Sequence, residues 1–316
     1  MEGEGFSELG RVQAIEKLLE SAGFGAAKAP GSRLAHKVLL EGIDFNLVYF
    51  PLKHLGYKAV VEVAGELEAG LSEPRSLSVV MGVSAKLDYP QIKQIWDGMC
   101  AAAREFGFAD VQLDLQPSRN GLALSLSATA EPSAEFGSPA SKDLICVSGP
   151  LGAAYLGQRL LESKLGGKED PSKDLERYKM IVGACLRPDV PSGMARKFAQ
   201  SGLKPTGGYF VGRGLADAVL RLSRDSGLGA KVYADKIPFE GGSFDLGREL
   251  DVDPVSAAMN GGDDCRLLFT VPIADAERFR RDFQTFDIIG HLALSEAGCV
   301  MVTPDGVELP LSAQGW

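Results

Sequence analysis

Apolar positions recur at helical spacing in two early stretches of the chain. Over residues 11–22 they fall on one face, which consists of Val12, Ile15, Leu18 and Leu19. Over residues 90–106 the same spacing is more regular and gives a stripe of Ile92, Ile95, Trp96, Met99, Ala103 and Phe106. Residues three and four apart lie on one side of a helix, so both stretches are predicted to be helices. The second stripe, including Trp96 and Met99, is expected to be core.

Shorter runs that are rich in β-branched and alternating apolar residues predict strands. In the first half of the chain they cover residues 76–85, 111–116 and 122–130. The sequence "SRNG" at 118–121 is a turn signal, so the last two strands are expected to form a hairpin. The second half repeats the mixture, with strands predicted at 143–149, 265–272 and 299–303 and helices at 150–163, 192–202 and 214–226.

A change of composition separates the two halves. Residues 131–142, "EPSAEFGSPASK", are rich in proline, glycine and serine, and we place a domain boundary there. Residues 1–135 are expected to form an N-terminal sheet domain and residues 136–316 a C-terminal α/β domain. The polar tract 164–174 is predicted to be a surface loop. Mixed strands and helices in two halves favour a two-domain protein of the α/β or α+β class.

Composition and charge limit the kind of partner. The chain has 316 residues, of which 45% are hydrophobic and 24% charged, as is usual for a globular protein. Its net charge of -9 argues against nucleic acid as a partner, although a small phosphate ligand needs only a local site. No apolar run approaches a membrane span, the N-terminus has no signal-peptide pattern, and the five cysteines are widely spaced. We therefore expect a cytoplasmic protein with reduced thiols.

Two glycine-containing turns are candidates for phosphate or metal chemistry. Gly149 and Gly152 lie between a predicted strand and a helix, where backbone N–H groups can approach a phosphate, but their spacing also suits a plain tight turn. Asp263 and Asp264 precede the strand at 265–272. They can hold Mg²⁺ beside a substrate phosphate, or they can be a charged turn.

Other catalytic arrangements have little support in the sequence. The three histidines are far apart and lack the spacing of metal ligands; they are His36, His54 and His291. We find no serine-nucleophile elbow and no evident Cys–His arrangement, so nothing favours hydrolase chemistry.

Several stretches, taken in order, resemble one family. They are "LLEGIDFNLVYFPLKHLGYKAVV" (39–61), "EPRSLSVVMGVS" (73–84), "DLICVSGPLGAAYLGQRLLE" (143–162), "NGGDDCRLLFTVP" (260–272) and the tail ending in "LSAQGW". Together they are similar to the thiamine-monophosphate kinase family, which shares a two-domain fold with aminoimidazole ribonucleotide synthetase. The resemblance covers nearly the whole chain.

The resemblance implies a reaction and an assembly. Family members transfer the γ-phosphoryl group of ATP to thiamine monophosphate, use several Mg²⁺ ions bound by aspartates, and are homodimers whose N-terminal sheets combine. Phosphoryl transfer of this kind depends mainly on positioning and on neutralisation of charge by metals. By resemblance, ATP and Mg²⁺ are the expected cofactors, and the ligand cleft is expected between the two domains.

In the N-terminal half, the motifs of this chain depart from the family pattern. An N-terminal Gly-Asp-Asp motif is replaced by "GFGAAKAPGSRLAHKVLLEG" (23–42), and a Thr-Thr-Asp motif matches residues 35–37, where Lys37 replaces a metal-binding aspartate. An Asn-Leu-Ser-Asp motif matches residues 63–66 and keeps an acid only as Glu66. A Gly-Gly-Asp-Thr-Thr motif matches residues 112–116 and keeps only Asp114.

Similar losses occur in the C-terminal half. An Asp-x-Ser-Asp-Gly motif matches Phe210–Gly214, where both aspartates are gone and Arg213 replaces one of them. A Gly-Gly-Glu-Asp-Tyr-Glu motif matches residues 261–266, where Asp263 and Asp264 persist. The resemblance thus makes Asp114 and Asp264 the candidate catalytic residues, and Glu66, Asp114 and Asp263 the remnant of a metal site. Candidate ligand-binding residues are Gly149, Gly152, Lys37, Arg213 and Trp316, the last of which matches a family tail aromatic near the thiamine pocket.

Because Lys37 and Arg213 reverse the sign of charge, they are expected to oppose Mg²⁺ binding. Two unit charges about 4 Å apart interact by about 4 kcal/mol at an effective dielectric constant of about 20. The leading expectation is therefore a degenerate family member whose kinase activity is lost or strongly reduced. Lys37 and Arg213 either pair with Asp114, Glu66 or Asp264, or bind a phosphate directly. The alternatives are an active kinase that uses the four remaining acids, and a non-catalytic protein that binds a nucleotide or a thiamine phosphate.

Overall fold

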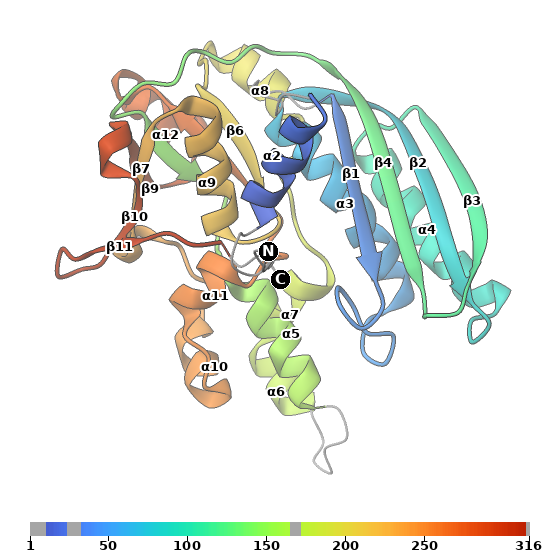
Figure 1. Cartoon of the computed structure of the whole chain (residues 1–316). Helices are drawn as coiled ribbons and strands as arrows, with labels where there is room; N and C mark the ends of the chain where they lie inside the picture. Colours follow the sequence, from blue (N-terminus) through green and yellow to red (C-terminus); the bar gives the residue numbers. More distant parts are fainter. Residues whose placement is uncertain (1–10, 24–32, 165–171, 314–316) are drawn as a thin grey trace.

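The chain folds around two β-sheets, one from each half of the sequence (Figure 1). The structure is a computed structural model and describes residues 11–23, 33–164 and 172–313. The predicted boundary at residues 135/136 lies between the last strand of the first sheet and the first strand of the second.

The first sheet has four strands in the order β1-β4-β2-β3, with bounds β1 Leu34–Leu40, β2 Ser72–Ser84, β3 Asp110–Ser118 and β4 Ala123–Pro132. One face packs against two long helices, α3 Leu52–Ala69 and α4 Tyr89–Glu105 (Figure 1). The predicted stripe of α4 is confirmed as core, since Ile95 and Met99 are fully buried and Trp96 packs against the same cluster.

The predicted hairpin of the last two strands is wrong. β3 pairs with β2 in parallel, β4 pairs antiparallel with β2 and β1, and β2 therefore lies between β3 and β4. The unit β2-α4-β3 is a crossover connection, which brings β3 back beside β2 in the same direction. The turn at 118–121 then carries the chain past β2 rather than directly into a paired strand.

The other face of the first sheet is exposed. Along β1 and β4 buried and exposed residues alternate, as the pleat requires when only one face is covered. Val38, Leu40 and Val80 are among the apolar side chains on the exposed face. Hydroxyl-bearing side chains of β4 lie between them in register.

The second sheet has seven strands in the order β11-β10-β7-β9-β5-β8-β6. Their bounds are β5 Leu144–Val147, β6 Gly207–Val211, β7 Gly229–Tyr233, β8 Arg266–Val271, β9 Asp287–Ala293, β10 Cys299–Val302 and β11 Glu308–Pro310. Every strand predicted in this half is present, and four further ones, β6, β7, β9 and β11, lie in stretches that the sequence analysis did not assign.

The second half of the described chain also contains helices (Figure 1). They are α5 Ala153–Ser163, α6 Ser172–Arg177, α7 Lys179–Leu186, α8 Met194–Ser201, α9 Leu215–Ser226, α10 Ser243–Leu250, α11 Pro254–Asn260 and α12 Ala276–Asp282, with short 3₁₀ turns η1 Ala234–Lys236, η2 Ile273–Asp275 and η3 Ser295–Ala297. One apolar cluster contains residues of both sheets, including Val79 and Phe269, so the two halves share a core. Among the described residues no helix is long and apolar enough to cross a membrane.

Helix α2 Arg11–Ser21 confirms the helix predicted at 11–22, but its apolar face is only partly buried. Val12 is buried, whereas Ile15 and Leu18 are exposed. The helix contacts α9 (Figure 1), and this placement brings it to the cleft between the two sheets.

Candidate functional site

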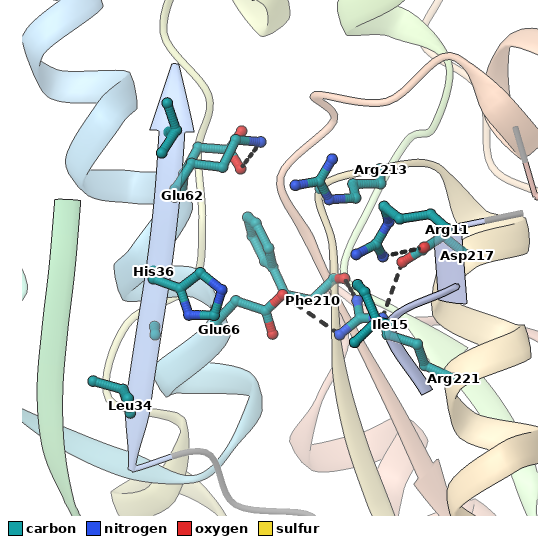
Figure 2. Close-up of a pocket in the computed structure, with 14 residues that line it drawn as sticks. Arg11, Ile15, Leu34, His36, Glu62, Glu66, Phe210, Arg213, Asp217 and Arg221 are labelled. Carbon is teal, nitrogen blue, oxygen red and sulfur yellow. Dashed lines mark hydrogen bonds and ion pairs between the residues drawn. The ribbon is translucent and has the colours of Figure 1, made fainter. Parts of the chain in front are cut away.

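A cleft of about 460 Å³ lies where the two halves meet (Figure 2). Strand β1 and helix α3 form one wall (Figure 2). Helices α2 and α9, strand β6 and the loop between β6 and α9 form the other. Charged side chains dominate the lining and comprise Arg11, Lys37, Glu62, Glu66, Arg213, Asp217 and Arg221. The predicted cleft between the two domains is therefore present, and three candidate residues, Lys37, Glu66 and Arg213, line it.

Helix α3 supplies the charges at the bottom of this region. Lys58, Glu62 and Glu66 are four residues apart and so lie along one face of the helix, within a sequence that is otherwise apolar. Lys58 and Glu62 are buried, and an unpaired charge in such a position is costly. Each of them therefore requires an opposite charge nearby.

Two buried ion pairs meet this requirement. The Lys37 Nζ lies 3.0 Å from Glu62 Oε2, and the Lys58 Nζ lies 2.9 Å from Asp263 Oδ2. Burial alone would lower the pKa of Lys37, but the carboxylates of Glu62 and Asp263 together more than offset this and raise it. Burial would likewise raise the pKa of Asp263, but Lys58 and Lys37 hold it below its usual value. Lys37 and Asp263 are therefore charged at neutral pH.

Asp264 has a different environment from its neighbour. Its carboxylate accepts hydrogen bonds from the backbone N–H groups of Gly152, at 2.7 Å, and Ala154, at 3.1 Å. Burial raises its pKa to about 7, even though the two N–H groups favour the charged form. The amino end of α5, which the glycine turn suggested as a phosphate site, thus holds a carboxylate of the same chain.

A second network lies on the wall that α9 provides. The Arg221 guanidinium bonds to Asp217 at 2.9 Å, approaches Glu66 at 3.4 Å and donates to the Phe210 carbonyl. Arg11 of α2 also pairs with Asp217 (Figure 2). Arg11, the first residue of helix α2, therefore fixes this helix to α9 on the same wall of the cleft.

Arg213 is the exception among the cations of the cleft. It is exposed, and within the described part of the chain its guanidinium has neither an ion-pair partner nor a hydrogen bond. In Figure 2 its side chain projects from its loop toward the wall that carries Glu62. As far as the described residues show, the guanidinium of Arg213 is therefore available to an anion in the cleft.

The remaining candidates lie elsewhere. Asp114 is exposed on β3, where it accepts hydrogen bonds from its own neighbours, the Leu115 N–H and Gln116 Nε2. It lies in register with Val80 on the exposed face of the sheet, whereas Lys37 is on the buried face of the opposite edge strand. The expected pairing of Lys37 with Asp114, Glu66 or Asp264 is wrong, because its partner is Glu62.

Gly149 has a φ of 140° and Gly152 a φ of 78°, which explains the glycine requirement of this turn. A side chain at Gly152 would approach the backbone N of Ala258 to 2.9 Å. Trp316 and all of residues 24–32 lie outside the described residues.

Among the described residues, the acids near the cleft are already paired, which disfavours a magnesium centre. Mg²⁺ in a phosphotransferase site is held by one or two carboxylates together with waters and substrate phosphates. In the described ranges no group of three or more His, Cys, Asp or Glu side chains converges on one point. The acids nearest the cleft are occupied by Lys37, Lys58, Arg221 or backbone N–H groups.

Lys58, Glu62, Asp217 and Arg221 were missed by the sequence analysis. For the first two a signal existed, because the four-residue spacing of Lys58, Glu62 and Glu66 places charges on one face of an apolar helix. For Asp217 and Arg221 the spacing is also four, but such pairs are common on exposed helices and do not indicate a cleft.

Several known proteins are similar to this chain in sequence. No family model matches the chain. The chain is 26% identical over 272 residues to the thiamine-monophosphate kinase of Pyrococcus horikoshii. The alignment covers 83% of this chain and 78% of that kinase. The chain is also 26% identical over 223 residues to that of Methanopyrus kandleri, with 70% and 67% covered. This chain is a relative of the thiamine-monophosphate kinases.

Solved structures agree on the fold. The thiamine-monophosphate kinase of Aquifex aeolicus superposes with a TM-score of 0.77 at 21% identity, covering 94% of this chain and 97% of that one. A structure described as "AaThiL complexed with AMPPCP and TMP" gives 0.80 at 20% identity, with 98% and 97% covered. The hydrogenase maturation protein HypE in complex with ATP gives 0.63 at 19% identity, with 89% and 85% covered. The expected fold, shared by these kinases and aminoimidazole ribonucleotide synthetase, is confirmed.

Proposed function

We propose that this relative of the thiamine-monophosphate kinases has lost most or all of its kinase activity and binds a phosphate-bearing ligand in the cleft without Mg²⁺. ATP and thiamine monophosphate are the first ligands to consider, because a related structure is described with an ATP analogue and TMP. The five free cysteines support a cytoplasmic location for this protein.

The pairing of the acids around the cleft carries the proposal. Glu62 is bound to Lys37, Asp263 to Lys58, and Asp264 to two backbone N–H groups. For Mg²⁺ to bind Asp263 or Glu62, a buried ammonium group would have to lose its partner. Breaking a buried ion pair costs about 3–5 kcal/mol. Lys37 and Lys58 therefore neutralise Glu62 and Asp263, the carboxylates that Mg²⁺ would otherwise need.

Arg213 supports the second half of the proposal. It is the cleft cation for which the described residues provide no carboxylate. A guanidinium can bind a phosphate directly through two parallel hydrogen bonds. Such a contact would replace one made through a metal ion. A phosphate-bearing ligand in the cleft would place its anionic group within reach of this side chain.

A turnover assay tests the loss of activity. The full chain is incubated with ATP, MgCl₂ and thiamine monophosphate, and thiamine diphosphate is quantified. Because kinases typically turn over at about 1–100 per second, we expect a rate below about 0.01 per second. Normal turnover that disappears in Asp263→Asn and Asp114→Asn, but not in Asp245→Asn on exposed α10, would establish an active kinase instead.

Calorimetry tests the binding. ATP and thiamine monophosphate are titrated into the full chain with MgCl₂ and, separately, with EDTA. We expect each ligand to bind with the same affinity under both conditions. In Arg213→Gln the affinity should fall by about tenfold, which corresponds to the free energy of one charge-assisted hydrogen bond. The matched control is Arg248→Gln, which removes the same charge from an exposed helix. Binding that needs Mg²⁺ would contradict the proposal.

We also propose that the protein is a homodimer. The exposed face of the first sheet carries apolar side chains on β1 and β2, including Val38 and Val80. An uncovered sheet face of this kind favours association, and the family resemblance favours the pairing of two N-terminal sheets.

A further inference from the structure

A second cavity, of about 510 Å³, lies on the C-terminal sheet and shares no lining residue with the cleft. It is formed by strands β5, β7 and β9 together with the loop before β5, the turns η1 and η2, and helix α12. Its lining consists of Lys142, Leu144, Tyr233, Lys236, Ile273, Arg280, Ile288, Gly290 and His291.

The charge of this cavity is opposite to that of the chain. Lys142, Lys236 and Arg280 line it, and among the described residues no Asp or Glu does, although the chain carries a net charge of -9. The nearest carboxylates are distant for ion pairs, since Lys236 is 3.7 Å from Asp235 and Arg280 is 3.8 Å from Glu277. Lys142 has no ion pair within the described ranges. The three cations are therefore weakly neutralised.

The floor of the cavity is apolar and aromatic. The rings of Tyr233 and His291 are stacked, with centroids 5.8 Å apart and an interplanar angle of 29°. Burial, assisted by the charge of Lys231, lowers the pKa of His291, so the ring is neutral at pH 7. Ile273 is 56% exposed at the edge of the same cavity. Flat rings and aliphatic side chains here provide a surface for a planar apolar group.

Lys142 is held in place by its loop. Its N–H donates to the Leu292 carbonyl at 2.8 Å, and the neighbouring Asp143 accepts from the Ala140 N–H at 3.0 Å and from Thr206 Oγ1 at 2.7 Å. Its φ of 77° is unusual for a residue with a side chain. The backbone that presents this ammonium group is thus fixed before any ligand arrives.

We infer that this cavity binds a small organic anion that combines a planar ring with one phosphate or carboxylate group. The ring would lie over Tyr233 and His291, and the anionic group would contact Lys142, Lys236 and Arg280. This cavity shares no lining residue with the cleft, so either proposal can fail without the other.

The test uses phenyl phosphate as the probe and the full chain as the protein. Isothermal titration is carried out with phenyl phosphate, with inorganic phosphate and with phenol. If the ring and the anion are both recognised, phenyl phosphate binds at least about tenfold more tightly than either fragment, which corresponds to one added favourable contact. Equal affinities for phenyl phosphate and inorganic phosphate would overturn the inference. So would the absence of detectable binding of phenyl phosphate at about 10 mM, because a specific site should have a Kd below that concentration.

Paired variants locate the site. Lys236→Gln combined with Arg280→Gln is expected to weaken phenyl phosphate binding by at least about tenfold, as loss of charge-assisted hydrogen bonds predicts. Arg281→Gln combined with Arg248→Gln removes two positive charges from helices outside the cavity and is expected to leave binding unchanged. Equal weakening in both double variants would show a general charge effect and overturn the assignment.

Discussion

At the scale of single residues, Asp264 shows how one position balances opposing effects. Burial disfavours its carboxylate, while the N–H groups of Gly152 and Ala154 and the amino end of α5 favour it. The pKa of about 7 means that burial dominates. The folded state consequently prefers the protonated acid over a range of pH in which the unfolded chain is ionised.

This balance predicts a pH-dependent stability. Because the pKa of Asp264 is raised from an unfolded value of about 3.9 to about 7, its contribution to stability is greatest below about pH 4 and declines up to about pH 7. In Asp264→Asn this decline is absent. From pH 5 to pH 8 the wild type should therefore lose about 2 kcal/mol relative to the variant.

Urea unfolding of both proteins at pH 5 and pH 8 measures the difference. Asp245→Asn, on exposed α10, serves as the control and should follow the wild type at both pH values. A difference between wild type and Asp264→Asn that stays constant with pH would show that Asp264 is already ionised in the folded state at pH 5.

The sequence identified charged residues of the site but not their partners. Lys37 was predicted to meet Asp114, Glu66 or Asp264, and instead it meets Glu62. Alternation along a strand decides which face a side chain occupies, and the register that places Lys37 and Asp114 on opposite faces depends on pairing between distant strands. Nothing local to either residue contains that information.

At the scale of elements, close contact between α3 and α4 depends on two glycines. A Cβ at Gly56 would lie 1.9 Å from the Ile95 carbonyl oxygen, and a Cβ at Gly98 would lie 1.9 Å from that of Lys53. Since the obstacle is backbone in both cases, the helices would have to move apart. Their separation sets the position of Lys58 and Glu62, and so of the buried ion pairs.

We therefore expect Gly56→Ala and Gly98→Ala each to destabilise the protein by at least about 2 kcal/mol, as overpacking does. Gly183 of α7 is the matched control, because a Cβ there meets nothing within 4 Å. Gly183→Ala should be neutral or stabilise by up to about 1 kcal/mol, owing to the higher helix propensity of alanine. Urea midpoints of the three variants provide the comparison, and equal midpoints would refute the packing argument.

Elements were predicted better than their arrangement. Periodicity located α4 and strands β2, β3 and β4, because each carries its own local pattern of apolar residues. The turn at 118–121 suggested a hairpin, yet both neighbouring strands pair with β2. Strand order depends on which strand edges are available for pairing. β2, with 13 residues, offers a long edge on each side, one to β3 and one to β4.

At the scale of the whole molecule, the two faces of the first sheet contrast sharply. One is covered by α3 and α4, and the other exposes Val38 at 51% and Val80 at 37% beside the small side chains of β4. Asp114 lies in the same row of this face as Val80, far from the cleft of its own chain. Pairing of two such faces would remove apolar surface from water, at about 25 cal/mol for each Å².

The proposed dimer predicts the effect of a charge on this face. In Val80→Lys, an ammonium group would be buried without a partner at the interface, so the dimer should dissociate while the monomer stays folded. Light scattering after gel filtration should give the mass of two chains for the wild type and of one chain for the variant. Met180→Lys alters another exposed apolar residue, 62% exposed on α7, and should leave the mass unchanged. A monomeric wild type, or a Val80→Lys variant that keeps the mass of two chains, would show that this face is not the interface.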